Sequence, residues 1–200
     1  MGALLGLWRI HRMALGALFA LLAHAVISGG KVIEGVYEGL FSAGAPSNGT
    51  SEVQTLTIGG TPDGGTFKLA YAGFTTAAIA WSATNNTLRD NVDAALEALP
   101  TIGAGNVTTA VGTMTAGIGT LTITFAAALG KLAVPTITVA DNSLTGTSPT
   151  LDVAETTPGV DATARGAPKG ATLTDTTNGE LYINTGTAQA PTWTKVGTQS

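Results

Sequence analysis

Side chains able to do acid–base or metal chemistry are few in this chain. It has two histidines, His11 and His24, both inside an apolar N-terminal stretch, and no cysteine. A catalytic triad or a histidine-based zinc site needs further partners, and no spacing in the sequence supplies them. The lack of cysteine excludes disulfides, thiolate metal sites and cysteine nucleophiles. We therefore interpret both histidines as helix or interface residues.

Three carboxylates, Asp90, Asp93 and Glu97, recur at helical spacing and could together suggest a cation site. Solvated acidic helix faces are far commoner than metal sites, so we expect no metal here. No nucleotide-binding or nucleophile-elbow motif appears, and no carboxylate pair can be placed across a cleft as glycoside hydrolysis requires. The sequence predicts a non-enzymatic protein without a cofactor, and a carbohydrate-active enzyme is the least favoured alternative.

Composition favours β-structure and gives no nucleic-acid signature. The 200 residues are 44% hydrophobic and 11% charged, with 27 glycines and a net charge of −4. Threonine is abundant after Asn48, and β-branched residues suit pleated strands. The nine basic residues are scattered and form no stripe that could neutralise phosphates, so we expect no direct contact with nucleic acid.

The stretch from Leu4 to Ile27 is strongly apolar. Basic residues at 9 and 12 precede an apolar run over 13–22, and Ala23-His24-Ala25 follows, an order typical of a secretory signal peptide. The run is too short and interrupted for a transmembrane helix, which needs about 20 apolar residues. We prefer the hypothesis that the segment is retained. It would then bury its apolar side chains on a partner, on copies of itself or on its own domain.

Between Ser51 and Val160 the sequence predicts about seven short strands and one helix. Apolar residues alternate at spacing two in 54–58, 66–71 and 120–125, which indicates strands with one buried face. The run 59–65 contains Asp-Gly and Gly-Gly pairs, so we expect a hairpin turn there between two strands. Apolar residues in 88–99 recur at helical spacing, with Thr87 and Asp90 as an N-terminal cap and Pro100 as the stop. We expect an antiparallel sandwich with one inserted helix.

Several phrases in this region resemble an immunoglobulin-like domain that recurs in structural proteins of tailed bacteriophages. They are Ser51-Glu-Val-Gln-Thr-Leu-Thr-Ile-Gly-Gly-Thr-Pro-Asp-Gly-Gly-Thr-Phe67, Thr75-Thr-Ala-Ala-Ile-Ala-Trp81, Asp93-Ala-Ala-Leu-Glu-Ala-Leu99 and Ile102-Gly-Ala-Gly-Asn-Val107. The resemblance covers about half of the chain and extends through Gly146-Thr-Ser-Pro-Thr150 and Thr157-Pro-Gly-Val160. It implies a place on a capsid, head fibre or tail. Similar modules also occur in bacterial surface proteins.

The last forty residues predict a small module of three strands. Asn178-Gly179 is a strong hairpin signal between apolar alternations, and Pro191-Thr-Trp193 begins a third strand. Three short strands bury too little to be secure alone, so we expect oligomerisation or docking. The pieces Pro168-Lys-Gly, Leu181-Tyr-Ile-Asn-Thr-Gly and Pro191-Thr-Trp are similar to the tails of many phage head and fibre proteins.

These observations divide the chain into an N-terminal apolar attachment segment (1–48), an immunoglobulin-like β-sandwich (49–160) and a three-stranded C-terminal β module (161–200). We predict a virion structural protein on the capsid surface, a decoration or head-fibre subunit. It would bind the major capsid protein, form a homo-oligomer (a trimer by analogy) and stabilise the shell or display a surface for host contact. A membrane partner is not expected. The residues expected to attach are apolar: Leu4, Leu7, Trp8, Leu15, Leu18, Phe19, Leu22, Ile27, Val36, Tyr37, Leu40 and Phe41.

Two other assignments remain open. The first is a tail-associated phage protein. The second is a secreted or cell-surface adhesion module from which residues 1–25 are removed on export.

Overall fold

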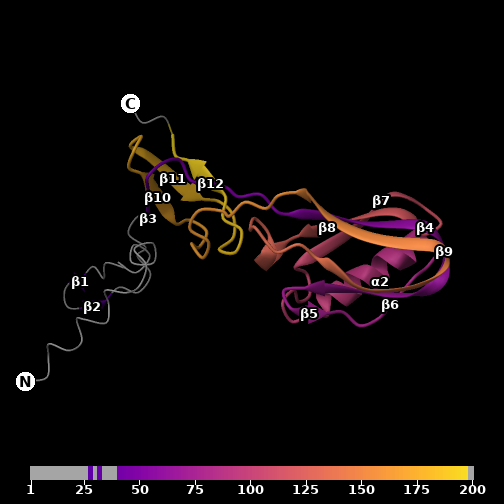
Figure 1. Cartoon of the computed structure of the whole chain (residues 1–200). Helices are drawn as coiled ribbons and strands as arrows, with labels where there is room; N and C mark the ends of the chain where they lie inside the picture. The colour runs from indigo at the N-terminus through magenta and orange to yellow at the C-terminus, as the bar shows by residue number, and fades with distance from the viewer. Residues whose placement is uncertain (1–26, 29–30, 33–39, 198–200) are drawn as a thin grey trace, which may run out of the picture.

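The computed structural model describes residues 27–28, 31–32 and 40–197 (Figure 1). In this part of the chain the structure is mainly β, with a larger and a smaller sheet that lie end to end and one α-helix. The predicted fold class, a sandwich-like antiparallel β-structure with an inserted helix and a small C-terminal β module, is confirmed. Of the predicted attachment segment (1–48), the structure describes 27–28, 31–32 and 40–48.

The larger sheet is organised around two very long strands that pair along nearly their whole length. β4 is flanked by β9 on one side and by β8, β6 and β5 on the other, and β7 pairs with β8. All of these pairs are antiparallel. The strands are β4 (Val53–Tyr71), β5 (Phe74–Thr75), β6 (Ile79–Ala80), β7 (Val107–Thr115), β8 (Ile118–Phe125) and β9 (Thr138–Thr157).

β4 bends in the middle, and the predicted hairpin turn at 59–65 is wrong. The β4–β9 register shifts at Gly59/Thr61 and again at Pro62/Gly64, which marks bulges within one continuous strand. Gly60 has φ +73°, and a Cβ there would lie 2.1 Å from the carbonyl oxygen of Ser148 on β9. Pairing with β9, a strand about 85 residues away, overrides the local turn signal. The glycines therefore allow a bend within one strand and do not form a hairpin turn.

The bend lets both halves of β4 face one core. Buried side chains lie at even positions before it, as in Leu56 and Ile58, and at odd positions after it, as in Phe67 and Leu69. All four belong to one hydrophobic cluster, which also includes Phe125 of β8. The curled sheet thus has the two facing layers of a sandwich, although the layers share their long strands.

Helix α2 (Asn85–Glu97) fills the remaining side of this core (Figure 1). Leu88, Val92 and Leu96 are fully buried, as the apolar spacing predicted. The predicted cap at Thr87 is wrong, since the helix begins after Thr84. The side chain of Asn85 instead bonds outside the helix, donating to the carbonyl of Met114 at 2.9 Å and accepting from the backbone N–H of Gly117 at 2.9 Å.

The smaller sheet contains the three predicted C-terminal strands and one strand that the sequence did not reveal. β10 (Thr172–Asp175), β11 (Glu180–Asn184) and β12 (Trp193–Lys195) are antiparallel neighbours, and the β10–β11 turn includes Gly179 at φ +68°. β3 (Leu40–Ser42) pairs with β10 in parallel. The core of this sheet is Leu173, Trp193 and two alanines, with Leu40 and Tyr182 packed against it. Two short strands, β1 (Ile27–Ser28) and β2 (Lys31–Val32), pair with each other.

Candidate functional site

The two sheets meet where the chain passes into and out of the larger one. Thr50 and Val160 exchange two backbone hydrogen bonds of 2.9 Å. One step further out, the N–H of Thr163 donates to the carbonyl of Ser47 at 2.9 Å, and the N–H of Ser47 donates to Oγ1 of Thr163 at 2.9 Å. The incoming and outgoing segments therefore run side by side, and residues 50–160 form an insertion between β3 and β10.

Lys131 joins the loop after β8 to the smaller sheet. Its Nζ donates to the carbonyl oxygen of Pro191 at 3.0 Å and to Oγ1 of Thr192 at 2.8 Å. Its own backbone is held from both sides, because its N–H donates to Oγ of Ser51 at 3.1 Å and its carbonyl accepts from the N–H of Ala162 at 3.1 Å. The residue has φ +52°, a conformation that these contacts must hold in place.

Arg165 makes a second bridge at the same junction. Its guanidinium donates to the carbonyl oxygens of Ala128 (2.6 Å), Gly130 and Lys131 (3.2 Å). These carbonyls lie at and just after the short 3₁₀ helix η2 (Ala127–Leu129), whose last C=O groups lack partners within the helix. A fixed fork of donors suits such a cluster of carbonyls better than an ammonium group would.

Trp193 completes the junction from β12. Its side chain is buried, and its indole Nε1 donates to the carbonyl of Thr163 at 2.8 Å. Its backbone N–H donates to Oδ1 of Asn48. The segment 47–50, the linker after Val160 and β12 are thus tied together, which makes the junction a continuous set of hydrogen bonds.

A buried polar pair stabilises the same end of the larger sheet. Glu52 and Gln54 are almost fully buried near the start of β4 and contact each other through Glu52 Oε1 and Gln54 Nε2. Glu52 Oε2 accepts from the N–H of Val134 at 3.0 Å, and Gln54 Oε1 accepts from the N–H of Ile137 at 2.8 Å. Their role is to hold the loop before β9 against the sheet. Burial and the charge of Glu52 raise the pKa of Tyr71 above its usual value.

The smaller sheet carries two carboxylates with lowered pKa values. The side chain of Asn178 is the main cause for Asp175, whose oxygens also accept the backbone N–H groups of Thr177 and Asn178. Hydrogen bonds from Lys195 and Tyr182 lower the pKa of Glu180, and Glu180 in turn raises the pKa of Tyr182. Asp175 thereby organises the β10–β11 turn, while Glu180 links β11 to β12.

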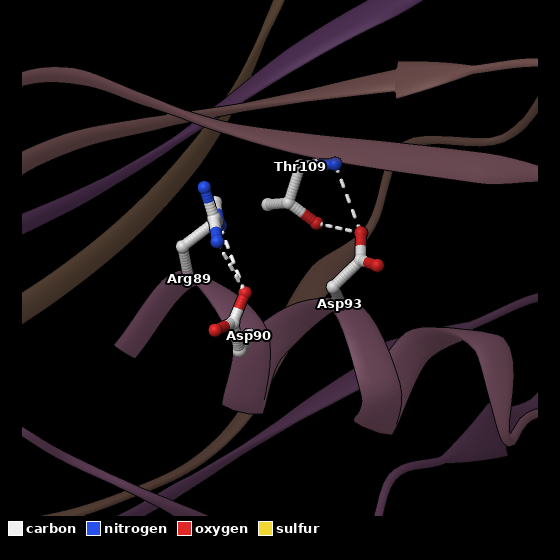
Figure 2. A network of polar contacts seen from close by, with 4 residues as sticks. All are labelled: Arg89, Asp90, Asp93 and Thr109. Atoms are coloured by element: carbon white, nitrogen blue, oxygen red, sulfur yellow. Dashed lines mark hydrogen bonds and ion pairs between the residues drawn. The ribbon is translucent and has the colours of Figure 1, made fainter. Parts of the chain in front are cut away.

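The carboxylates of α2 have separate partners. Asp90 pairs with Arg89, and Oδ1 of Asp93 accepts from the backbone N–H of Thr109 at 2.9 Å and from its hydroxyl (Figure 2). Glu97 accepts from the N–H of Gly105 at 2.6 Å. Within the described residues, no three His, Asp or Glu side chains are placed to share a metal ion. Asp93 thus binds β7, Glu97 binds the loop before β7, and Asp90 pairs within the helix.

The structure locates only three of the predicted attachment residues. Leu40 is half-buried in the core of the smaller sheet, Phe41 follows it in β3, and Ile27 lies in β1. The remaining nine lie outside the described residues: Leu4, Leu7, Trp8, Leu15, Leu18, Phe19, Leu22, Val36 and Tyr37. His11 and His24 fall there too. Among the helices that the structure does describe, none has the length and apolarity to span a bilayer.

Among solved structures, the comparisons with known proteins include a distant neighbour from a phage. No protein-family model matches the chain, and no curated protein matches it either. A solved structure from Mycobacterium phage Patience is similar with a TM-score of 0.37 and 20% sequence identity, over 74% of this chain and 47% of that one. The chain therefore spans about half the length of this phage protein.

Proposed function

We propose that this chain is a non-enzymatic structural protein of a phage virion, a capsid decoration or head-fibre subunit. Its apolar N-terminal segment would bind the major capsid protein, and the larger sheet would be displayed on the capsid surface. The observation that carries the proposal is the insertion of residues 50–160 between β3 and β10, with both crossing segments hydrogen-bonded at Thr50 and Val160. A domain held by two adjacent segments at one end leaves its opposite end free.

The order of segments in the chain suggests how the N-terminal segment, the smaller sheet and the larger sheet would follow one another in the proposed subunit. Because the N-terminal segment precedes β3 in the sequence, it would adjoin the smaller sheet. The smaller sheet would then be the base nearest the shell, and the larger sheet would stand outward from it. This order differs from a linear series in which the C-terminal strands project farthest. Lys131 and Arg165 would keep the projecting domain from hinging on the base.

A truncation tests the attachment. Because β3 begins at Leu40, removing residues 1–39 leaves all strands of both larger and smaller sheets in place. We expect the truncated chain to fold and to lose binding to capsids that lack the protein, measured by cosedimentation. Stoichiometric binding by the folded truncation would contradict the proposal.

Point substitutions provide a matched control. Leu15→Asp with Leu18→Asp places charges in the apolar segment and should abolish cosedimentation, because buried apolar area drives such docking. Thr115→Asp adds a charge at an exposed position at the end of β7 and should bind like the natural chain. Equal binding by both variants would rule out apolar docking through residues 13–22.

Export is the second candidate function, favoured by the basic, apolar and small-residue order of residues 9–25. It predicts an adhesion module whose mature chain begins at Val26. The intact mass of the natural protein separates the two candidates, since attachment through residues 1–39 requires Met1 or Gly2 at the N-terminus.

A further inference from the structure

β7 and β9 both lie at edges of the larger sheet, and among the described residues the edge of β7 is covered. At β7, the carboxylate of Asp93 on α2 takes up the outward N–H and the hydroxyl of Thr109 (Figure 2). A register shift between Val111 and Met114 then interrupts the strand. Covering and bulging are the usual ways in which natural sheets prevent an edge from pairing with another chain.

The edge of β9 has no such cover among the described residues. β9 is 20 residues long and pairs only with β4. Its first part is interrupted near Gly146 and Pro149, but no register shift interrupts the pairing between Thr150 and Ala154. In the part of the chain that the structure describes, the backbone of 150–157 bonds to β4 alone. From Thr150 to Glu155 the strand is therefore regular and has one free side.

The backbone groups at the free side can be assigned. The N–H of Phe125 on β8 donates to the carbonyl of Glu52 at 3.0 Å, so even-numbered residues in this part of β4 face β8. Odd-numbered residues face β9, and Asp152 lies opposite one of them. Asp152 therefore bonds to β4, while its neighbours Leu151 and Val153 direct their N–H and C=O groups outward. The two N–H groups and two C=O groups of these residues are therefore available to pair with another strand.

The side chains of this edge specify what would fit. Leu151 and Val153 are half-buried at the rim of the core, whereas Asp152 and Ala154 are exposed on the other face. A partner strand would thus place apolar residues opposite the first pair and polar residues opposite the second.

The charge of β9 indicates which charge a partner strand should carry. β9 carries Asp141, Asp152 and Glu155 and has no Lys or Arg. The whole stretch 50–160 has eight acidic and three basic residues, a net charge of −5. Pairing β9 with a second copy of itself would bring two acidic edges together, which is unfavourable. A basic strand would instead place opposite charges across the seam.

We infer that the β9 edge over 150–155 is a β-addition site for an extended segment of a partner protein in which apolar residues alternate with Lys or Arg. Main-chain hydrogen bonds to Leu151 and Val153 supply the pairing, and Asp152 with Glu155 supplies the charge preference. The site does not involve residues 1–39, so its failure would leave the proposed attachment intact.

A short peptide probes the edge in the full-length protein. The capped peptide Thr-Lys-Val-Lys-Val-Thr, antiparallel to β9, sets its valines opposite Leu151 and Val153 and its lysines on the side of Asp152. We expect saturable binding that slows hydrogen exchange of the Leu151 and Val153 amides at least tenfold. The amides of Asp152 and Ala154, already bonded to β4, should change little.

Two matched comparisons make the test decisive. N-methylation of the valine amides should abolish binding, whereas N-methylation of the lysine amides, which face away from β9, should preserve it. The double variant Asp152→Lys, Glu155→Lys changes two exposed side chains and should reverse the preference from the lysine peptide to its glutamate counterpart. Equal binding of both N-methylated peptides, no binding at all, or protection of these amides by self-association would overturn the inference.

Discussion

Nζ of Lys131 lies 2.8 Å from Oγ1 of Thr192, so a loop of the larger sheet is held by the segment that leads into β12 of the smaller one. The two residues are 61 positions apart, and Arg165 reinforces their contact from the linker. These contacts join the two sheets, so we expect them to move together as one body.

Lys131→Met should weaken this junction. The substitution keeps the length of the side chain and removes the donors to Pro191 and Thr192, so we expect a loss of about 1–2 kcal/mol in the free energy of unfolding. Urea unfolding followed by tryptophan fluorescence measures it. Lys169→Met is the control, since Lys169 is exposed, and it should change stability by less than about 0.5 kcal/mol. If both variants changed the free energy of unfolding equally, the Lys131 contacts would contribute nothing to stability.

Gly60→Ala should disrupt the bend in β4. The new Cβ would lie 2.1 Å from the Ser148 carbonyl oxygen at φ +73°, so steric overlap adds to the conformational cost, for a loss of about 3 kcal/mol. Gly73→Ala has a similar φ of +85° but open space around it, and should lose only about 1 kcal/mol. Thermal unfolding of both variants isolates the contact with β9. A difference near zero would be inconsistent with a close β4–β9 approach.

Glu52→Ala should loosen the loop before β9. The N–H of Val134 loses its acceptor in a buried place, and Gln54 loses one partner, so we expect a loss of about 2 kcal/mol. Hydrogen exchange at Val134 should rise well before global unfolding. Glu155→Ala, which removes an exposed carboxylate, is the control and should leave that amide protected.

Acid should destabilise the smaller sheet. The pKa of Asp175 is lowered in the folded state, chiefly by the Asn178 side chain, and that of Glu180 is lowered by Lys195 and Tyr182. The contribution of both carboxylates is full above their ordinary pKa of about 4 and is lost as the pH falls through the lowered folded values. Thermal melts between pH 6 and pH 2 should show this loss. It should be smaller in Asp175→Asn, and an unchanged pH profile in that variant would refute the role of Asp175.

The alternating pattern was enough to predict most of the core. Leu56, Ile58, Phe67 and Leu69 are buried as expected, because a period of two places them on one face of a strand. Trp81 is only half-buried, and its indole N–H donates to the carbonyl of Gly117 at 3.1 Å. Local periodicity thus predicts which face of a strand is buried, but it does not predict how deeply each side chain on that face is buried.

Long-range pairing explains what the sequence did not reveal. The Pro-Asp-Gly-Gly stretch has the composition of a turn, and only its pairing with β9 shows that it bends a single strand. Nothing local in Leu40–Ser42 indicates that it pairs in parallel with β10, about 130 residues later. The outward N–H groups of Leu151 and Val153 depend on the β4–β8 register, so the free edge could not be assigned from side-chain patterns either.

Thr50 and Val160 are joined by two backbone hydrogen bonds, so the domain between them could be exchanged for another. Because the chain leaves and returns through neighbouring residues, an inserted domain must have its two ends close together, and the contacts of Lys131 and Arg165 are a further feature of the present insertion. A foreign domain with neighbouring termini, spliced in place of residues 51–159, would leave β3 and β10 free to pair. The smaller sheet could then carry different inserted domains.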